Sequence, residues 1–257
     1  MRLQLVLGKI VVLLGACGMV FAFVQLSLAS HARDASQEPY ASDVRMAITR
    51  SPGNFAPDGD LSKASWKAAA SVEFDHDAFG QLHHPEVSTR VASLWTESNI
   101  YFAFWARYDS LNFYEGEDPA TERWRLWERD VVEVFLNPQP ERVLQYFEFE
   151  VAPNNQWVDL EIDKSKDSSN KESWDSGFAH ATRVDGKSHL WTTEMRIPVS
   201  ALNVSAIHAG DKWRANFFRA AGQGADEHRQ FLAWSTIPEG RTFHVPTRFG
   251  ILEFVNK

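Results

Sequence analysis

Short runs of alternating apolar and polar residues, separated by polar turns, recur from residue 44 to residue 254 and constrain the fold more than any other feature. Residues 87–95 and 100–108 flank the polar turn 96–99, which predicts a β-hairpin. The second strand of this hairpin is apolar on both faces, which predicts a central strand that is covered on both sides. No segment predicts a helix of more than a few turns. The sequence therefore predicts an all-β fold, an antiparallel β-sandwich of jelly-roll or immunoglobulin-like type, as a single domain after an N-terminal leader.

A further hairpin is predicted over residues 143–163, and it carries an unusual number of acids. A turn centred between positions 154 and 155 would place Glu150 opposite Asp159 and Glu148 opposite Glu161. Like charges in direct opposition destabilise a sheet, so a neighbouring arginine, a bound calcium ion or exposure to water should compensate them. The same register gathers the apolar residues of both strands on the opposite face: Phe147, Phe149, Val151, Val158, Leu160 and Ile162.

A tryptophan among charged residues marks the entrance of another predicted strand, residues 131–136. Trp127 is followed by the charged residues 128–130, and Glu133 lies inside the strand. A flat apolar ring beside acids suits a sugar, because the ring covers C–H faces and carboxylates accept hydrogen bonds from hydroxyl groups. The alternative is that Trp127 packs under a loop. Phe243 and His244 precede the last strand and act either as a ligand clamp or as a plug over the end of the sandwich.

Composition limits the partners of the chain. Of its 257 residues, 44% are apolar and 23% are charged, which is typical of a globular protein. The formal net charge is -8, and a nucleic-acid partner is therefore not expected, since it would need clustered lysine and arginine. The single cysteine, Cys17, precedes the predicted strands, so we expect no disulfide in the folded body.

The N-terminal residues have the layout of an export signal. Basic residues precede an apolar run at positions 10–24, and small residues follow it. Cleavage is expected after Ala29 or Ala32; the alternatives are retention as a membrane anchor and lipid attachment at Cys17. Each alternative places the body outside the cytoplasm, as a secreted, periplasmic or envelope-attached protein. The expected parts are a signal peptide or anchor at 1–32, a flexible tether at 33–43, and a sandwich at 44–257 that the sugar-suited pair Trp127 and Glu133 marks as carbohydrate-binding.

The motifs of common enzyme classes are absent from the sequence. It contains no glycine-rich phosphate loop and no Gly-x-Ser-x-Gly nucleophile motif. Its acids could serve glycoside hydrolysis, but any sheet with acids two residues apart meets the required spacing. We expect a non-catalytic protein and assign no catalytic residue. Two alternatives are a haem-binding, cytochrome-like sandwich with Met195 and either His180 or His244 as axial ligands, and a glycoside hydrolase or its accessory protein.

An ordered series of segments resembles the family 9 carbohydrate-binding modules, including those attached to bacterial xylanases. The resemblance covers most of residues 44–257. It implies a β-sandwich that binds glucan- or xylan-type oligo- or polysaccharides in carbohydrate catabolism, without catalysis and often with structural calcium. The segments are Asp58-Gly59 with Trp66, VASLWTESNIYFAFW at 91–105, WERDVVEVFL at 127–136, YFEFEVAPN at 146–154, WTTEMRIP at 191–198, WRANFFR at 213–219 and HVPTRFG at 244–250.

The same resemblance implies where a sugar would bind. In the xylanase modules two tryptophans sandwich a terminal sugar, and the first of them falls on Trp127. The hydroxyl acceptor of the strand that follows falls on Glu133. The second tryptophan falls at Phe243, so a smaller ring replaces it, and His244 is its neighbour.

The resemblance also implies departures from the family pattern. A sugar-contacting arginine of the xylanase modules falls on Glu148, and a nearby asparagine falls on Glu150. These acids favour a cation, or a sugar that is held through calcium. Asn216 and Arg219 are further ligand-binding candidates, but they point to opposite faces of one strand, so at most one can reach the site.

Overall fold

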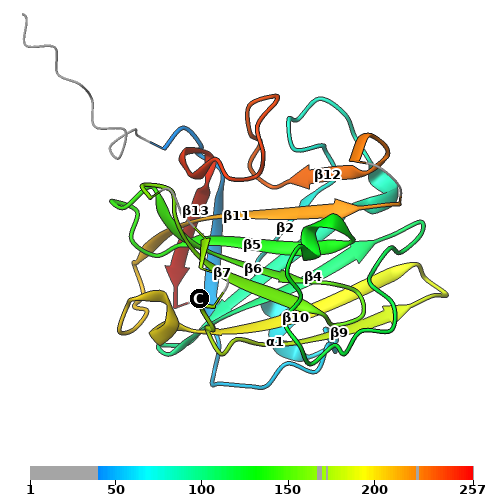
Figure 1. The fold of residues 1–257 in the computed structure, drawn as a ribbon. Helices are drawn as coiled ribbons and strands as arrows, with labels where there is room; N and C mark the ends of the chain where they lie inside the picture. The colour runs from blue at the N-terminus through cyan, green and yellow to red at the C-terminus, as the bar shows by residue number, and fades with distance from the viewer. Residues whose placement is uncertain (1–39, 167–169, 172, 224–225, 257) are drawn as a thin grey trace, which may run out of the picture. The chain divides into compact units, whose positions relative to one another are not determined.

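The computed structural model describes residues 40–256, apart from positions 167–169, 172 and 224–225 (Figure 1). The expected leader and nearly all of the expected tether lie outside the described residues. The described residues all belong to one compact unit, residues 33–257. Within them, no helix has the length and apolar character that a membrane crossing requires.

Strands dominate this unit, and its helices are single turns. In chain order, the elements are β1 (Arg45–Arg50), α1 (Ala64–Ala68), β2 (Ser71–Phe74), η2 (Pro85–Val87), β3 (Thr89–Trp95), β4 (Asn99–Arg107), η3 (Leu126–Glu128), β5 (Val131–Asn137), β6 (Gln145–Val151), β7 (Trp157–Asp163), β8 (Asn170–Lys171), β9 (Ala179–Asp185), β10 (Leu190–Pro198), η4 (Val199–Leu202), β11 (Lys212–Ala221), η5 (Asp226–His228), β12 (Gln230–Ala233), η6 (Pro246–Arg248) and β13 (Gly250–Val255).

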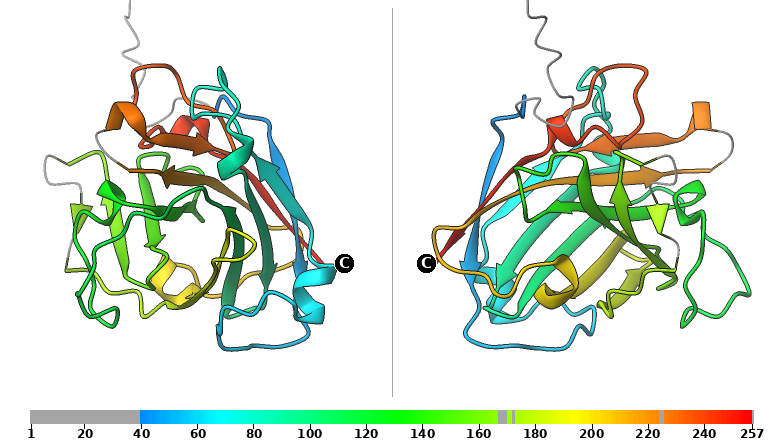
Figure 2. Two further views of the ribbon diagram at one scale, coloured as in Figure 1. Left: turned by 90° about the vertical axis from the view of Figure 1, so that its right-hand side faces the viewer. Right: turned by 60° about the vertical axis from the view of Figure 1, so that its left-hand side comes forward.

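The strands form one continuous sheet in the order β8-β7-β6-β5-β11-β13-β1-β3-β4-β10-β9, with β12 added beside β11 and β2 beside β3. The sheet curls so that its β5–β6–β7 part faces its β4–β10–β9 part (Figure 2). Phe217 of β11 bridges the two layers, because its ring lies 5.6 Å from that of Phe102 and 6.2 Å from that of Phe104 on β4. The predicted all-β sandwich is confirmed.

The sequence predicts a wholly antiparallel sheet, and this part of the prediction is wrong. The sheet is mixed. β1 pairs in parallel with both β13 and β3, while the other pairs of named strands are antiparallel. Tight hairpin turns enforce antiparallel pairing, whereas strands joined by long connections are free to run in parallel. β1 has no hairpin partner, so nothing in its local sequence signals its direction.

The predicted central hairpin is confirmed. Residue 95 of β3 pairs with residue 100 of β4, and β4 lies between β3 and β10. Successive side chains of β4 point alternately into two separate hydrophobic cores. Phe102 and Phe104 lie between the layers, and Tyr101 packs on the outer side with Trp66 of α1.

The predicted register of the β6–β7 hairpin is wrong by one residue. Glu150 lies opposite Val158, and Glu148 lies opposite Leu160. The connection has five residues, 152–156, and Asn155 adopts a positive φ of 68° within it. An odd number of loop residues changes which side chains share a face, and a shift by one residue exchanges the two faces of a strand.

This shift exchanges the two faces of β7 relative to those of β6. Asp159 and Glu161 lie opposite Phe149 and Phe147, so the expected opposition of acid to acid across this hairpin does not occur. The two β6 glutamates instead share a face with the apolar residues Val158, Leu160 and Ile162. The expectation that these apolar residues lie on the opposite face from the glutamates is therefore wrong.

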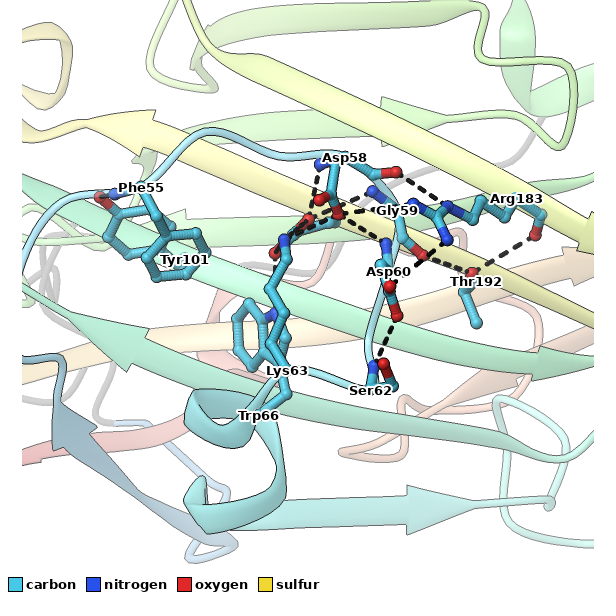
Figure 3. A network of polar contacts seen from close by, with 11 residues as sticks. Phe55, Asp58, Gly59, Asp60, Ser62, Lys63, Trp66, Tyr101, Arg183 and Thr192 are labelled. Carbon is cyan, nitrogen blue, oxygen red and sulfur yellow. Dashed lines mark hydrogen bonds and ion pairs between the residues drawn. The ribbon is translucent and has the colours of Figure 1, made fainter.

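A buried carboxylate explains the Asp58-Gly59 and Trp66 segment. Glu194 of β10 is fully buried. It accepts hydrogen bonds from the backbone N–H of Asp58 at 2.8 Å and of Gly59 at 3.2 Å. It also accepts from the Nζ of Lys63 at 2.8 Å and the indole N–H of Trp66 at 2.7 Å. Figure 3 shows these donors converging from one loop and from α1. The segment therefore has a structural role.

The close approach of the same loop to β9 requires a glycine. Gly59 has a φ of +73°, and a Cβ atom there would lie 2.9 Å from Cγ of Arg183. Its carbonyl accepts a hydrogen bond from Thr192 Oγ1 at 3.0 Å, while Arg183 Nε donates to the carbonyl of Asp58 at 3.0 Å (Figure 3). Any side chain at position 59 would force these contacts apart.

Candidate functional site

A cavity of about 460 Å³ lies over the outer face of the β5–β6–β11 layer. Half-buried aromatic rings and buried acids line it, and loops after β4, β11 and β12 supply its walls. Its principal lining residues are Trp124, Trp127, Glu133, Glu148, Glu150, Arg229, Phe231, Phe243 and His244. The sequence candidates Asn216 and Arg219 do not line it.

Trp127 lies on the cavity wall and is half-buried. Leu126, which is fully buried, anchors the short η3 turn beneath it, and Arg125 enters this turn with a positive φ of 65°. The Trp127 ring meets the Trp124 ring edge-on, with centroids 4.9 Å apart and planes at 86°. A perpendicular contact of this kind covers at most one face of the Trp127 ring. Trp127 is therefore half-buried and lines an open cavity.

A buried arginine fixes the backbone of this turn. Arg229 Nη2 donates to the carbonyls of Trp127 at 3.0 Å and Arg129 at 2.8 Å, while Nη1 pairs with Asp226 at 3.0 Å. Its guanidinium lies 4.9 Å from the ring centroid of Phe231. The sequence analysis missed Arg229. A lone arginine in a loop belongs to no periodic pattern, and its partners are backbone carbonyls about a hundred residues away.

We expect Arg229→Met to destabilise the protein by about 1–3 kcal/mol. Methionine keeps the apolar stem but leaves two partly buried carbonyls without their donors. Urea unfolding measures the loss, and the emission of the Trp124–Trp127 pair should also change. Arg241→Met, at an exposed position on the cavity rim, is the matched control and should have little effect. Equal stability of the two variants would contradict the anchoring role of Arg229.

Three glutamates meet at the floor of the cavity. Glu133 of β5 is the direct cross-strand partner of Glu150 on β6, and Glu148 lies two residues further along the same face. One carboxylate oxygen from each lies within 4.8 Å of the others. The three residues are 2%, 3% and 0% exposed in the order Glu133, Glu148, Glu150. The sequence predicts that acids oppose one another across the β6–β7 hairpin. In the structure, acid opposes acid between β5 and β6 instead.

The protein environment disfavours charge on Glu133 and Glu150. Burial, followed by the charge of Glu148, raises the pKa of Glu133 well above its ordinary value. Burial and the charges of Glu133 and Glu148 raise the pKa of Glu150 in the same way. His244 offers little compensation, because burial lowers its pKa and its Nε2 lies 3.9 Å from Glu148 Oε2. Its Nδ1 shares a hydrogen bond of 2.8 Å with the Tyr146 hydroxyl.

Phe243 lines the opposite side of the cavity but packs on the sheet. Its ring stacks on Phe218 at a centroid distance of 4.1 Å and an angle of 12°. Phe231 meets it nearly edge-on at 6.0 Å. One face of Phe243 is therefore covered, and at most one face remains for a ligand. Phe243 therefore packs against the sheet and also lines the cavity, and its role as a ligand clamp stays a prediction.

The structure does not bring Asn216 and Arg219 into the cavity. Asn216 is buried, and its side-chain amide binds the backbone of Ser235 through bonds of 2.8 and 2.9 Å. Arg219 points to the other face of β11, where its guanidinium lies 4.7 Å from the Trp191 ring centroid. It pairs there with Asp130 at 3.5 Å. The expectation that these two side chains face opposite ways agrees with this arrangement.

The donors named for the haem alternative are divided between two places. Met195 and His180 are direct partners across β9 and β10, and Met195 is fully buried. His180 Nδ1 lies 3.1 Å from Asn155 Oδ1, and burial lowers its pKa to about 4. Neither residue lines the cavity that contains His244. Only Met195 with His180 therefore forms a neighbouring pair.

A β-sandwich with aromatic rings and acceptor oxygens around one cavity is the architecture of a carbohydrate-binding module. The chain belongs to the family described as "Carbohydrate family 9 binding domain-like", whose model matches residues 58–257. The family resemblance of the sequence is thereby confirmed. The chain is accordingly one of the carbohydrate-binding proteins.

Relatives in fungi and bacteria are similar to this chain. A protein of the fungus Arthroderma benhamiae named "Extracellular protein" is 26% identical over 201 residues, which are 74% of this chain and 87% of that protein. A structure from Bacteroides uniformis, described as a candidate carbohydrate-binding protein, superposes with a TM-score of 0.67 at 19% identity and covers 83% of this chain and 100% of its own.

Two further structures are of a family 9 module from Caldicellulosiruptor kristjanssonii. The complex with cellotriose has a TM-score of 0.60 at 15% identity and covers 83% of this chain and 95% of its own. The complex with glucose has a TM-score of 0.58 at 14% identity and covers 83% and 97%. At these identities the likeness shows a shared fold.

Proposed function

We propose that this chain is a non-catalytic protein that binds glucan- or xylan-type oligo- or polysaccharides in the cavity beside Trp127. The observation that carries the proposal is the pairing of a half-buried tryptophan ring with buried, unpartnered carboxylate oxygens in one cavity. The cellotriose and glucose complexes of the family 9 module support the choice of glucose-type sugars.

Recognition would divide between the wall and the floor of the cavity. The ring of Trp127 covers the apolar C–H face of a sugar, which releases water from both surfaces. Below it, the oxygens of Glu133, Glu148 and Glu150 accept hydrogen bonds from sugar hydroxyl groups. Four of these oxygens have no hydrogen-bond partner among the described residues. A sugar would therefore supply donors that the protein lacks.

The proposal places this protein outside the cytoplasm, where it would serve carbohydrate catabolism beside enzymes such as xylanases. The name of the Arthroderma benhamiae relative supports an extracellular setting. The apolar run at positions 10–24 supports export, with either release or attachment to the cell envelope through the leader.

An array of plant and microbial glycans tests the proposal. The wild-type chain is expected to bind at least one β-glucan or xylan oligosaccharide with a Kd below about 1 mM, equivalent to about −4 kcal/mol. Chromatography of the recovered ligand should show it intact after prolonged incubation. Absence of binding to every glycan would refute saccharide binding, and shortened products would refute the non-catalytic assignment.

A further inference from the structure

The three cavity glutamates form a compact group of oxygen ligands. Glu133, Glu148 and Glu150 come from two adjacent strands, so the β5–β6 pairing sets their spacing and no flexible loop is involved. One oxygen of each lies within 4.8 Å of the others. Calcium–oxygen bonds measure about 2.3–2.6 Å, so two oxygens on one calcium ion can be at most about 5 Å apart. The spacing of the glutamates therefore fits a single shared cation.

The carboxylates lack the partners that buried acids normally have. Both oxygens of Glu150, Oε1 of Glu133 and Oε2 of Glu148 have no hydrogen-bond partner among the described residues. A buried charge without a partner is strongly unfavourable, and two or three of them close together repel one another. The arrangement is not explained by packing, because an apolar side chain at any of these positions would avoid this cost.

The nearby basic groups are already used elsewhere. Arg229 binds two backbone carbonyls and Asp226, and Arg219 lies on the other face of β11 beside Asp130. Within the described part of the chain, His244 is the one basic side chain in ion-pair range, 3.9 Å from Glu148. Arg229 and Arg241 line the cavity, but no ion pair joins either of them to the three acids among the described residues. The charges of Arg229 and Arg219 offset the raised pKa of Glu133 only in part. A cation from outside the chain would supply the remaining positive charge.

We propose that Glu133, Glu148 and Glu150 bind a divalent cation of the calcium type at the floor of the cavity. A donor set made only of carboxylate oxygens suits hard cations, and calcium accepts six to eight oxygen ligands. The three glutamates supply part of this shell, and the open cavity leaves room for water or ligand hydroxyl groups to complete it. The inference does not depend on the proposed function, since the cation would bind without a saccharide.

Calorimetric titration tests the site on full-length protein that has been stripped with EDTA. Ca²⁺ and Mn²⁺ are titrated separately in the absence of any sugar. We expect one cation per chain and a rise in Tm when the cation is in excess. Glu133→Gln, Glu148→Gln and Glu150→Gln are each expected to weaken binding by at least about 10-fold, because each removes a charged ligand.

The variants separate metal binding from folding. Glutamine keeps the shape of glutamate and removes mutual repulsion, so the stripped variants should melt no lower than stripped wild type. Glu253→Gln, which alters a partly exposed acid paired with Arg45 at 2.8 Å, is the control and should retain full cation affinity. Unchanged affinity in all three cavity variants would overturn the assignment.

A second ligand class provides the other decisive outcome. A primary ammonium group, as in an amino sugar, also satisfies clustered carboxylates by donating three hydrogen bonds. Glucosamine is therefore titrated beside Ca²⁺. Binding of glucosamine, with no heat from Ca²⁺ or Mn²⁺ at millimolar concentration, would overturn the metal site. Failure of the saccharide array would leave the cation titration unaffected, because no sugar takes part in that measurement.

Discussion

Replacement of Trp127 by alanine is expected to abolish retention of the protein on the saccharide that wild type binds. The ring is half-buried, lines the cavity and lies perpendicular to Trp124, so its removal takes away a contact surface with little loss of core. Aromatic residues at the centre of a binding site contribute about 2 kcal/mol or more, which is about 30-fold in Kd. Titration with the oligosaccharide identified on the array measures the change.

Trp105→Ala is the matched control for this prediction. Trp105 is also half-buried, but it lies on β4 with the Arg90 guanidinium 3.8 Å from its ring centroid. This variant should lose stability while keeping its saccharide affinity, since Trp105 does not line the cavity. Equal affinities of Trp127→Ala and wild type would refute the platform role. Equal losses in both variants would point to a general effect on the fold.

Replacement of Glu194 by alanine is expected to destabilise the fold by about 3–5 kcal/mol, with a fall in Tm of about 10 °C. The carboxylate receives two backbone N–H groups, the Lys63 ammonium and the Trp66 indole. Its loss would leave buried donors without an acceptor and release the loop that crosses β10. Urea unfolding measures the loss, and Glu194→Gln should fall between wild type and alanine.

An exposed ion pair supplies the comparison for Glu194. Glu97 contacts Arg50 at 2.6 Å, with side chains 67% and 45% exposed. Water solvates both partners after either is removed, so Glu97→Ala should cost no more than about 1 kcal/mol. Comparable losses in Glu97→Ala and Glu194→Ala would show that burial of the Glu194 network contributes nothing.

Local alternation of residue types predicts the hairpins of this fold because neighbouring strands joined by short turns obey a period of two. The strand 100–108 is apolar on both faces, and its burial between two strands follows directly. Register is harder to predict. The odd number of residues in the loop 152–156 decides which residues of β7 share a face with the glutamates of β6. The position of the turn centre cannot be read from two adjacent asparagines.

The candidate site could be predicted only in part. Four candidates could be chosen from their residue types and their positions beside predicted strands, and the structure brings them to one cavity: Trp127, Glu133, Phe243 and His244. Their arrangement depends on the pairing of β5 with β6 and on the contacts of Arg229 with the η3 turn, which is distant in the sequence. Asn216 shows the converse case. Asn216 lies on the correct face of its strand, but its side-chain amide is hydrogen-bonded to the backbone of Ser235 and does not reach the cavity.

The parallel pairing of β1 with β13 has a consequence for folding. These two strands lie at the centre of the strand order, where they join the β5–β11 half of the sheet to the β3–β10 half. β1 and β13 are about 200 residues apart in the chain, since Arg45 pairs with Ile251. The hairpins of each half can form from local contacts, but the two halves are joined only when these distant segments meet. Contacts between such distant residues slow folding and prolong the exposure of strand edges, so the pairing of β1 with β13 is expected to be a slow step in folding.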